Sequence, residues 1–320
     1  MLFQILFQKI TLVLGFVALG GSIANAAGTS CSKYIVESAG DELSFNNYLF
    51  QDFRSLSGSS AGPKAPGTND GVVIAAYEAA TSSPKVPTTA MKSYFQGIPR
   101  TWLVSSWNRM NSPVPMQNQP ANAFIDYDPT TPYSQDTMLS ITTSRGTNGI
   151  QTAGELQSVF SLNYGSIRFQ SRVTGAPGAC AGMFLYKDDT HESDFEFLTR
   201  DGSSYVHMTN QPGNENGIPV PGATTNLSLI YPYSEWTNYR LDWSPGMTRY
   251  FVNGEIVANK TVNVSPLPMY WMMNMWSDGT SWPGVMAVGN SARLDIRWLQ
   301  IVYNNTNTLP ADGNVICVVE

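Results

Sequence analysis

Three acidic side chains stand two residues apart at Glu192, Asp194 and Glu196. Successive side chains of a β-strand point to opposite faces, so the three acids would share one face while Phe195 and Phe197 point to the other. The Cα atoms of the two glutamates would lie about 13 Å apart, at a rise of about 3.3 Å per residue. Side chains that lean toward each other can close this to the roughly 5–5.5 Å of a retaining glycosidase, in which one glutamate is the nucleophile and the other the acid and base.

The aspartate between them would act through its charge. A negative charge beside a carboxylic acid raises the pKa of that acid, and three acids this close titrate as a coupled set. The same pattern also fits a strand whose acids are simply solvated, or a cation site. Calcium is the weaker alternative because its oxygen ligands come mostly from loops and not from one face of a strand.

A hairpin after the acidic strand would bring a histidine beside these acids. Asp201-Gly202 is a two-residue turn signal. A two-residue loop there pairs Glu196 with His207, Asp194 with Thr209, and Glu192 with Gln211. A change of one residue in the loop would move His207 to the other face. The other histidine, His191, is interpreted as a loop residue.

A second strand, over residues 269–276, carries a polar and aromatic face. The residues on that face are Tyr270, Met272, Asn274 and Trp276, and the opposite face carries Trp271 and Met273. Sugars stack their apolar ring faces on aromatic rings and form hydrogen bonds through their hydroxyls. We therefore expect Asn274, Trp276 and the nearby loop residue Trp282 to bind substrate, and Trp107 to form a further platform. Core positions for Trp276 and Trp107 are the alternative, and Trp271 is expected in the core.

Short apolar or alternating runs bounded by Gly, Pro, Asn and Asp recur along the chain, and long helical periodicity is absent. This pattern predicts an all-β sandwich or barrel. The expected strands are 44–54, 101–107, 138–143, 166–173, 182–186, 193–198, 205–209, 239–243, 248–252, 269–276 and 293–303. Residues 55–120 are rich in Ser, Gly, Ala and Pro and are interpreted as a surface insertion in a single domain that spans residues 27–320.

The first 26 residues predict a secretory signal peptide. Lys9 precedes an apolar run from Ile10 to Gly20, and Ala24-Asn25-Ala26 is a cleavage signal. An N-terminal membrane anchor is the alternative, which the shortness of the run disfavours. The C-terminus has no hydrophobic tail, which argues against a glycolipid anchor. We expect a protein that is secreted to the extracellular space or the cell wall and is free of the membrane once the signal is removed.

Composition and charge exclude some partners. Charged residues make up 13% of the chain and the net charge is −6, which makes nucleic acid a poor partner. The chain has three cysteines. Secretion permits disulfides, and the termini of a domain often lie close together, so we expect Cys31 to pair with Cys317 and Cys180 to be a buried free thiol. Sequons predict N-linked glycans at Asn226, Asn259, Asn263 and Asn304.

The acidic segment resembles glycoside hydrolase family 16, whose motif is Glu-[Ile/Leu/Val]-Asp-x-Glu. Glu192, Asp194 and Glu196 match that motif, and Ser193 departs from it at a position off the predicted cleft face. The resemblance extends over roughly Thr137 to Tyr303. The segments that carry it are 154–158, 164–165, 169–173, 197–198, 209–210, 239–243, 250–254, 272–276 and 293–303. Gln170 and Asn253 stand where the family usually has Glu and Asp.

The resemblance implies a concanavalin A-like jelly roll with a concave carbohydrate cleft. Glu192 would be the nucleophile, Glu196 the acid and base, and Asp194 the helper, with no cofactor. Arg172 and Asn210 would join the substrate-binding residues. Some family members bind a structural calcium on the convex face, where Asp295 could serve. The sequons and a cell-wall substrate suggest a fungal source.

The expected activity is retaining endo-hydrolysis of a β-glucan with β-1,3 or mixed β-1,3/1,4 linkages, carried out by a monomer. Two alternatives remain open at this point. A glucan transglycosylase would use the same residues with a sugar hydroxyl in place of water. A carbohydrate-binding lectin on the same sandwich would need no carboxylate triad.

Overall fold

The computed structural model describes residues 31–54, 72–73, 101–131, 136–305 and 315–319. The predicted signal peptide and most of the predicted insertion lie outside these residues. The regular structure of the described residues is almost entirely β, with one 3-10 turn, η1 (Pro120–Asn122). Among them no helix is long and apolar enough to cross a membrane. The described residues from Cys31 onward belong to one compact unit.

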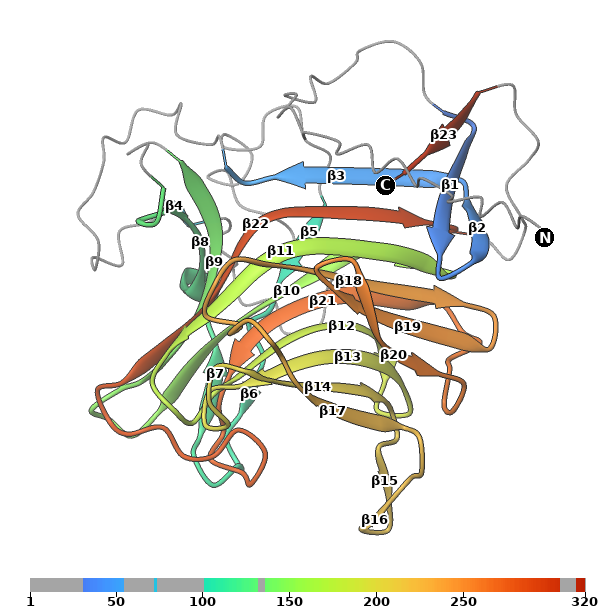
Figure 1. Ribbon diagram of the computed structural model, residues 1–320. Coiled ribbons are helices and arrows are strands. Elements are labelled where there is room, and N and C mark those ends of the chain that lie inside the picture. The colour runs from blue at the N-terminus through green and yellow to red at the C-terminus, as the bar shows by residue number, and fades with distance from the viewer. Residues whose placement is uncertain (1–30, 55–71, 74–100, 132–135, 306–314, 320) are drawn as a thin grey trace, which may run out of the picture. The chain divides into compact units, whose positions relative to one another are not determined.

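Two sheets form a jelly-roll sandwich (Figure 1). The sheet that carries the acids is named the cleft sheet, and its neighbouring strands are β5 (Trp102–Val104), β10 (Gln151–Leu162), β21 (Met269–Trp276), β12 (Cys180–Asp188), β13 (His191–Leu198), β14 (Tyr205–Asn210) and β17 (Thr224–Ser228). Each strand in this order pairs antiparallel with the next.

The opposite sheet is named the outer sheet. Its strands are β20 (Glu255–Lys260), β19 (Met247–Val252), β18 (Thr237–Ser244), β11 (Gly165–Gly175), β22 (Ser291–Tyr303), β3 (Asn47–Asp52), β9 (Thr137–Arg145), β8 (Ala123–Tyr127) and β4 (Val72–Val73). The long strand β22 pairs with β11 on one side and with β3 and β9 on the other. Strand β10 joins the two sheets, since its first residues pair with β9 and with β7 (Met116–Asn118) and its later residues pair with β21. Strand β7 also pairs with β6 (Asn108–Arg109).

Aromatic side chains fill the space between the sheets. Phe195 and Phe197 of β13 and Trp271 of β21 point inward and are fully buried. Phe195 packs edge-on against Tyr239 and Tyr250 of the outer sheet, with ring centroids 5.6 and 5.0 Å apart. This packing fixes which face of β13 is turned to the core, and the acids of β13 are therefore turned to the other face.

A small third sheet pairs the N-terminal strands of the described residues with the C-terminal strand. It contains β1 (Lys33–Ser38), β2 (Asp41–Phe45) and β23 (Ile316–Val318). A disulfide joins Cys31 to Cys317 with a Cα–Cα distance of 5.9 Å, which confirms the predicted pair. Cys180 is a buried free thiol, also as predicted. A separate two-stranded ribbon is formed by β15 (Asn214–Glu215) and β16 (Ile218–Pro219).

The predicted strands from residue 138 onward all fall within observed strands, but the early ones need correction. The segment 44–54 is interrupted at Asn46 and forms parts of β2 and β3, which belong to different sheets. The segment 101–107 is a strand only at β5.

The four sequons differ in accessibility. Asn226 and Asn259 are exposed on β17 and β20, and Asn263 is half-buried with its Nδ2 donating to the Pro212 carbonyl at 2.9 Å. Asn304 is only 5% exposed, and its amide contacts the Ser44 carbonyl and the Asn46 backbone N–H. The burial of Asn304 therefore argues against a glycan there in the folded chain. Glycans at the other three positions stay predictions.

Candidate active site

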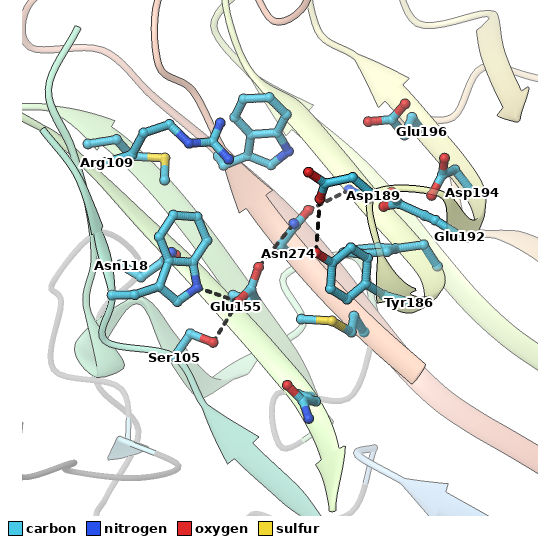
Figure 2. A pocket seen from close by; sticks show the side chains of 17 residues that line it. Ser105, Arg109, Asn118, Glu155, Tyr186, Asp189, Glu192, Asp194, Glu196 and Asn274 are labelled. Atoms are coloured by element: carbon cyan, nitrogen blue, oxygen red, sulfur yellow. Dashed lines mark hydrogen bonds between the residues drawn. The ribbon is translucent and has the colours of Figure 1, made fainter. Parts of the chain in front are cut away.

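Glu192, Asp194 and Glu196 lie on one face of β13 and line a cavity of about 380 Å³ (Figure 2). The neighbouring Ser193 is fully buried on the other face, where its hydroxyl donates to Asn210. The departure of Ser193 from the usual aliphatic residue therefore affects packing and leaves the acidic face unchanged. Asp194 is 2% exposed, so it is the most enclosed of the three acids.

Each acid has its own hydrogen-bond environment. Asp194 Oδ2 accepts from Gln211 Nε2 at 3.1 Å. Glu196 Oε1 accepts from Trp282 Nε1 at 3.1 Å and from Cys180 Sγ at 3.3 Å. Both donors contact the same oxygen of Glu196, so the two oxygens of this carboxyl group are not equivalent.

Burial raises the pKa of all three acids. The pKa of Glu192 rises to about 8 through burial; a hydrogen bond from Asp194 lowers it in part, and the charge of Glu196 raises it further. The pKa of Asp194 lies well above its usual range because it is buried beside both glutamates. Burial also raises the pKa of Glu196, against the two donors that stabilise its charge. Asp194 therefore favours its protonated form, in which its O–H can donate a hydrogen bond to Glu192. The site can hold a transferable proton near neutral pH, as general acid catalysis requires.

The cysteine beside Glu196 acts as a donor. Burial and the charge of Glu196 hold the pKa of the Cys180 thiol well above its usual range. The sulfur therefore stays protonated, and its S–H can point at Glu196 Oε1. A thiol in this state is a poor nucleophile, so its part in the site is to orient the carboxyl group.

The neighbouring wall of the cavity comes from β21 and β10, which lie next to β12 and β13 in the same sheet. Asn274 and Trp276 line the cavity, and Trp271 lies in the core, as the strand pattern predicted. Asn274 Oδ1 accepts from the Gly182 backbone N–H at 3.1 Å. A Cβ atom at residue 182 would lie 2.6 Å from that oxygen. Only glycine at this position leaves room for the Asn274 side chain.

Glu155 of β10 organises this wall. Its Oε1 accepts from Ser105 Oγ at 2.6 Å and from Trp107 Nε1 at 2.9 Å, and its Oε2 accepts from Asn274 Nδ2 at 3.4 Å (Figure 2). Trp107 is 40% exposed and lines the cavity. The indole is thus fixed at its nitrogen while its ring stays open to a ligand.

Arg109 lies across the two cavity tryptophans. Its guanidinium is 5.4 Å from the ring centroid of Trp107 and 5.4 Å from that of Trp276. It also pairs with the buried carboxylate of Asp278 at 2.9 Å. The cation therefore holds both rings at one end of the cavity.

Sequence reasoning did not single out Glu155, Arg109, Tyr186 and Asp189, which also line the cavity. Glu155 could have been found, because it is the single charged residue of an otherwise uncharged strand and shares a face with Gln157. Arg109 had no such signal, since the β6–β7 pairing decides where it lies. Tyr186 donates to Asp189 at 3.1 Å across the turn before β13.

A second cavity of about 740 Å³ adjoins the first and shares Glu192 and Glu196 with it. It is lined by Trp282, by Thr209 and Gln211 and by residues of the segment 213–226, which includes the β15–β16 ribbon. The two glutamates therefore lie between two open spaces, so a ligand longer than one sugar could extend past them on both sides.

The predicted hairpin register is confirmed, although the loop is longer than predicted. Glu196 pairs with His207 and Asp194 with Thr209, and the Gln211 N–H donates to the Glu192 carbonyl. The connection runs from Thr199 to Ser204. Two residues before the Asp201-Gly202 turn and two residues after it lie outside the strands. Because the two numbers are equal, the register of the strands does not shift.

Two residues expected to contact substrate have their polar atoms engaged within the protein. Asn210 is fully buried on the core side of β14, where it contacts Ser193, Thr248 and Tyr250. His207 is 6% exposed, and both of its ring nitrogens are held by Asp201 and Asn226. Direct substrate contact by Asn210 is therefore a wrong prediction, because its side chain points into the core. His207 lies on the face of Glu196 but lines neither cavity, and its contact with substrate stays a prediction.

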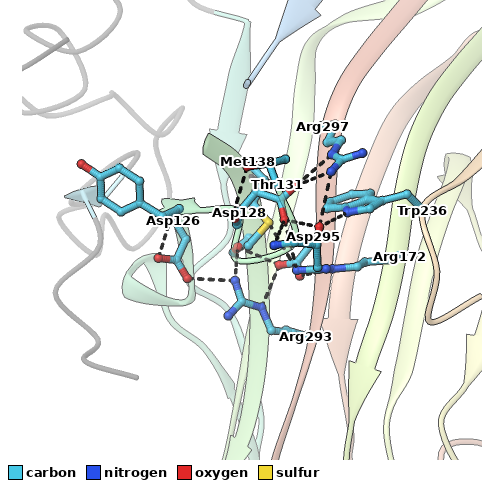
Figure 3. Close-up of polar contacts among 12 residues, drawn as sticks. Asp126, Asp128, Thr131, Met138, Arg172, Trp236, Arg293, Asp295 and Arg297 are labelled. Carbon is cyan, nitrogen blue, oxygen red and sulfur yellow. Dashed lines mark hydrogen bonds and ion pairs between the residues drawn. The ribbon is translucent and has the colours of Figure 1, made fainter. Parts of the chain in front are cut away.

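Arg172 and Asp295 lie on paired strands of the outer sheet, within a network of ion pairs (Figure 3), and neither lines a cavity. Arg172 Nε pairs with Asp295 Oδ2 at 3.0 Å, and Arg293 Nε pairs with Asp295 Oδ1 at 2.7 Å. Ser140 Oγ also donates to Asp295 Oδ1. Substrate binding by Arg172 is a wrong prediction because its guanidinium is consumed by this buried network.

The same network does not fit the calcium expected at Asp295. Both carboxylate oxygens already accept from guanidinium groups, which supply the positive charge that a cation would bring. Among the described residues no group of three or more His, Cys, Asp or Glu side chains could hold a metal ion. The prediction of calcium at Asp295 is therefore wrong for this arrangement.

Comparison with known proteins gives consistent results. Residues 119–300, more than half of the chain, match the model of glycosyl hydrolases family 16. The chain is 25% identical over 182 residues to a β-glucanase of Paenibacillus polymyxa, a match that covers 54% of this chain and 73% of that protein. It is 28% identical over 131 residues to a β-glucanase of Bacillus licheniformis (39% and 51%). It is 25% identical over 134 residues to Congo red hypersensitive protein 1 of Saccharomyces cerevisiae (39% and 25%). The chain thus spans about half or less of the last two relatives.

Solved structures agree on the fold. The Bacillus licheniformis β-glucanase has a TM-score of 0.52 at 18% identity, with 63% of this chain and 92% of that chain covered. The catalytic domain of an endo-1,3-β-glucanase from Thermotoga petrophila has a TM-score of 0.50 at 17% identity, with 65% and 93% covered. The jelly-roll fold, the acidic strand and the matched segment lead to one assignment. The chain belongs to glycosyl hydrolase family 16.

Proposed function

We propose that the protein is a retaining, endo-acting β-glucan hydrolase that cleaves β-1,3 or mixed β-1,3/1,4 linkages. The observation that carries this proposal is the set of three acids on one face of β13, with raised pKa values, between two adjoining cavities. The β-glucanases among the relatives support the substrate class.

Glu192 is the proposed nucleophile. Its carboxylate attacks the anomeric carbon while the glycosidic C–O bond breaks, and Glu196 gives its proton to the departing oxygen. Asp194, by donating a hydrogen bond to Glu192, favours the ionised form of the nucleophile. In the second step Glu196 removes a proton from water, the water oxygen bonds to the anomeric carbon, and Glu192 leaves. Two displacements at one carbon retain its configuration.

The two cavities suggest how a chain would lie. We place the retained part of the glucan in the first cavity, where Trp107 and Trp276 offer ring faces and Glu155 and Asn274 offer polar atoms. We place the leaving part in the second cavity, because Trp282, the partner of Glu196, lines it. Binding on both sides of the reacting bond is what endo-cleavage needs.

The variant Glu192→Gln tests the proposal. It keeps the size of the side chain and removes the nucleophile, so hydrolysis of a β-glucan should fall by several orders of magnitude. Unchanged activity would disprove the role of Glu192. NMR of the first product anomer separates retention from inversion, and an inverted product would contradict the double displacement. Turnover on a panel of β-1,3-, β-1,4- and mixed-linkage glucans and xyloglucan identifies the linkage.

The size of the second cavity favours transglycosylation as a second candidate. A space of about 740 Å³ beside Glu196 can hold a sugar acceptor whose hydroxyl takes the place of water. Adding acceptor oligosaccharides to the substrate panel separates the two reactions, since a transferase forms longer products and a hydrolase forms only shorter ones. Binding of oligosaccharide without any turnover would instead support a lectin.

We also propose that the mature protein begins after residue 26, is secreted to the extracellular space or cell wall and is a monomer. The Cys31–Cys317 disulfide supports an oxidising compartment. Mass spectrometry of the protein from a glycosylating host tests the cleavage point and the glycans at Asn226, Asn259 and Asn263. A mass that corresponds to the chain with its first 26 residues still attached would disprove cleavage.

A further inference from the structure

His207 lies directly beside the acid and base Glu196 but does not line either cavity. It is opposite Glu196 in the β13–β14 ladder. Its Nε2 lies 2.7 Å from Asp201 Oδ2, and its Nδ1 lies 2.9 Å from Asn226 Oδ1. A carboxylate only accepts hydrogen bonds, so Nε2 carries a hydrogen toward Asp201. The ring is held from both sides and cannot turn.

The fixed imidazole supports Trp282. The two rings meet edge-on, with centroids 4.9 Å apart and an interplanar angle of 65°. Trp282 belongs to the connection between β21 and β22 and has no strand to hold it. The turn that carries Asp201 is also hydrogen-bonded to this connection, because the Arg200 guanidinium donates to the Ser281 carbonyl. His207 thus contacts Trp282 and is itself held by Asp201, and neither residue lines a cavity.

The position of Trp282 decides which oxygen of Glu196 is engaged. Its Nε1 donates to Glu196 Oε1 at 3.1 Å, and Cys180 Sγ donates to the same atom at 3.3 Å. Two donors on Oε1 favour negative charge there and leave the proton to Oε2. A carboxylic acid that must protonate a leaving oxygen benefits from having its proton on one defined atom, since misplacement by about 1 Å can cost about 100-fold in rate.

We propose that Asp201 and His207 are positioning residues for acid catalysis: they hold Trp282 so that Oε2 of Glu196 carries the proton given to the leaving group. The inference rests on the proposed function, in which Glu196 is the acid and base. Because the pair acts only through this proton, its removal should affect substrates according to how much their leaving group needs protonation.

The test compares two substrates with the variant His207→Gln. One is a mixed-linkage glucan oligosaccharide, whose sugar leaving group needs a proton. The other is a 2,4-dinitrophenyl glycoside of the same glucan, whose leaving group departs without one. On the oligosaccharide kcat/KM should fall by about tenfold, a part of the 10²–10⁴-fold that acid catalysis contributes. On the dinitrophenyl glycoside kcat/KM should stay within about twofold of the wild type.

His191→Gln is a matched control. His191 also pairs with an aspartate, Asp188, at 2.7 Å, but it does not contact Trp282. It should leave both substrates unaffected. Asp201→Asn, at a residue more exposed than His207, is a second variant should His207→Gln not fold, and it should show the same dependence on the leaving group. Trp282→Phe should do so as well, and adding His207→Gln to it should bring no further loss.

An equal fall on both substrates would overturn the inference, because it would mean general damage to the cleft. No fall on the oligosaccharide with either His207→Gln or Asp201→Asn would overturn it as well. Glu196→Gln distinguishes these results from failure of the proposed function. If Glu196→Gln hydrolyses the oligosaccharide normally, the proposed function itself is wrong. If Glu196→Gln is impaired but the His207 and Asp201 variants are not, the positioning role alone is wrong.

Discussion

Replacing Glu192 by Gln should make the stability of the protein less dependent on pH. Burial raises the pKa of Glu192 from 4.5 to about 8. Between these two values the folded protein keeps a proton that the unfolded chain has released. The contribution of this proton to stability is fully present below pH 4.5 and is lost as the pH rises through about 8. Gln carries no titrating proton and still offers an oxygen to the hydrogen bond from Asp194.

The shift sets an upper limit on the effect. At about 1.4 kcal/mol per pKa unit, the full rise corresponds to ~5 kcal/mol. Part of the rise comes from the charges of Glu196, Asp189 and Glu155, and these groups can relieve it by taking up protons themselves. We therefore expect the difference in free energy of unfolding, variant minus wild type, to be ~2 kcal/mol more favourable to Glu192→Gln at pH 8.5 than at pH 4.5. For a chain of this size that is about 3 °C in melting temperature, at an unfolding entropy of about 2.1 cal/mol/K per residue.

The assay is thermal and urea unfolding of both proteins at several values between pH 4.5 and 8.5. Glu255→Gln, at an exposed position on β20, is the control and should follow the wild type throughout. The stability difference between Glu192→Gln and the wild type should become more favourable to the variant as the pH rises. A difference that stays constant, or that turns against the variant, would refute the assignment of a raised pKa to Glu192.

Three further predictions concern other parts of the molecule. Arg172→Met should cost about 1.5–3 kcal/mol in urea unfolding because it removes one of the two guanidinium partners of the buried Asp295 carboxylate. EDTA should leave the wild-type melting temperature unchanged because guanidinium groups occupy the place of a cation at Asp295, and a large effect of EDTA would contradict this occupancy. Trp107→Ala should raise KM for glucan about tenfold with little change in kcat. Trp107→Phe keeps a ring but cannot donate to Glu155, so its KM should lie between those of the wild type and Trp107→Ala. Equal KM values for all three proteins would argue against a sugar platform. Replacing Cys31 and Cys317 together by Ser should lower stability by up to ~5 kcal/mol, since the bridge closes a very long loop, and kcat should not change; an unchanged melting temperature would show that the bridge is dispensable.

Local patterns of the sequence carried several features of the site. The alternation of acids with Phe195 and Phe197 needs only the period of a strand, and it correctly separated the acidic face from the core. The position of His207 opposite Glu196 was predicted from the Asp201-Gly202 turn. The observed loop is longer than predicted, but its extra residues are divided equally between the two sides of the turn, so the register is the same. The face of β21 with Asn274 and Trp276 was likewise predictable, because a strand buried on one side has only one register.

Resemblance to a family placed residue types but not their surroundings. Arg172 and Asn210 sit on strands that were correctly predicted, yet their side chains are used inside the protein. The partner of Arg172 is Asp295, more than a hundred residues away, and the partners of Asn210 lie on three other segments. A burial partner so distant in sequence leaves no local signal.

By itself, the sequence determined the β class of the chain, the acids of β13 and their shared face, and the cysteines that close the termini. The tertiary structure alone decided what surrounds those acids. Glu155 meets Trp107 and Asn274, and Trp282 meets both Glu196 and His207, only because strands from separate parts of the chain become neighbours. Strand period is a local property of the backbone, whereas the pKa of a buried acid and the identity of its donors depend on long-range packing.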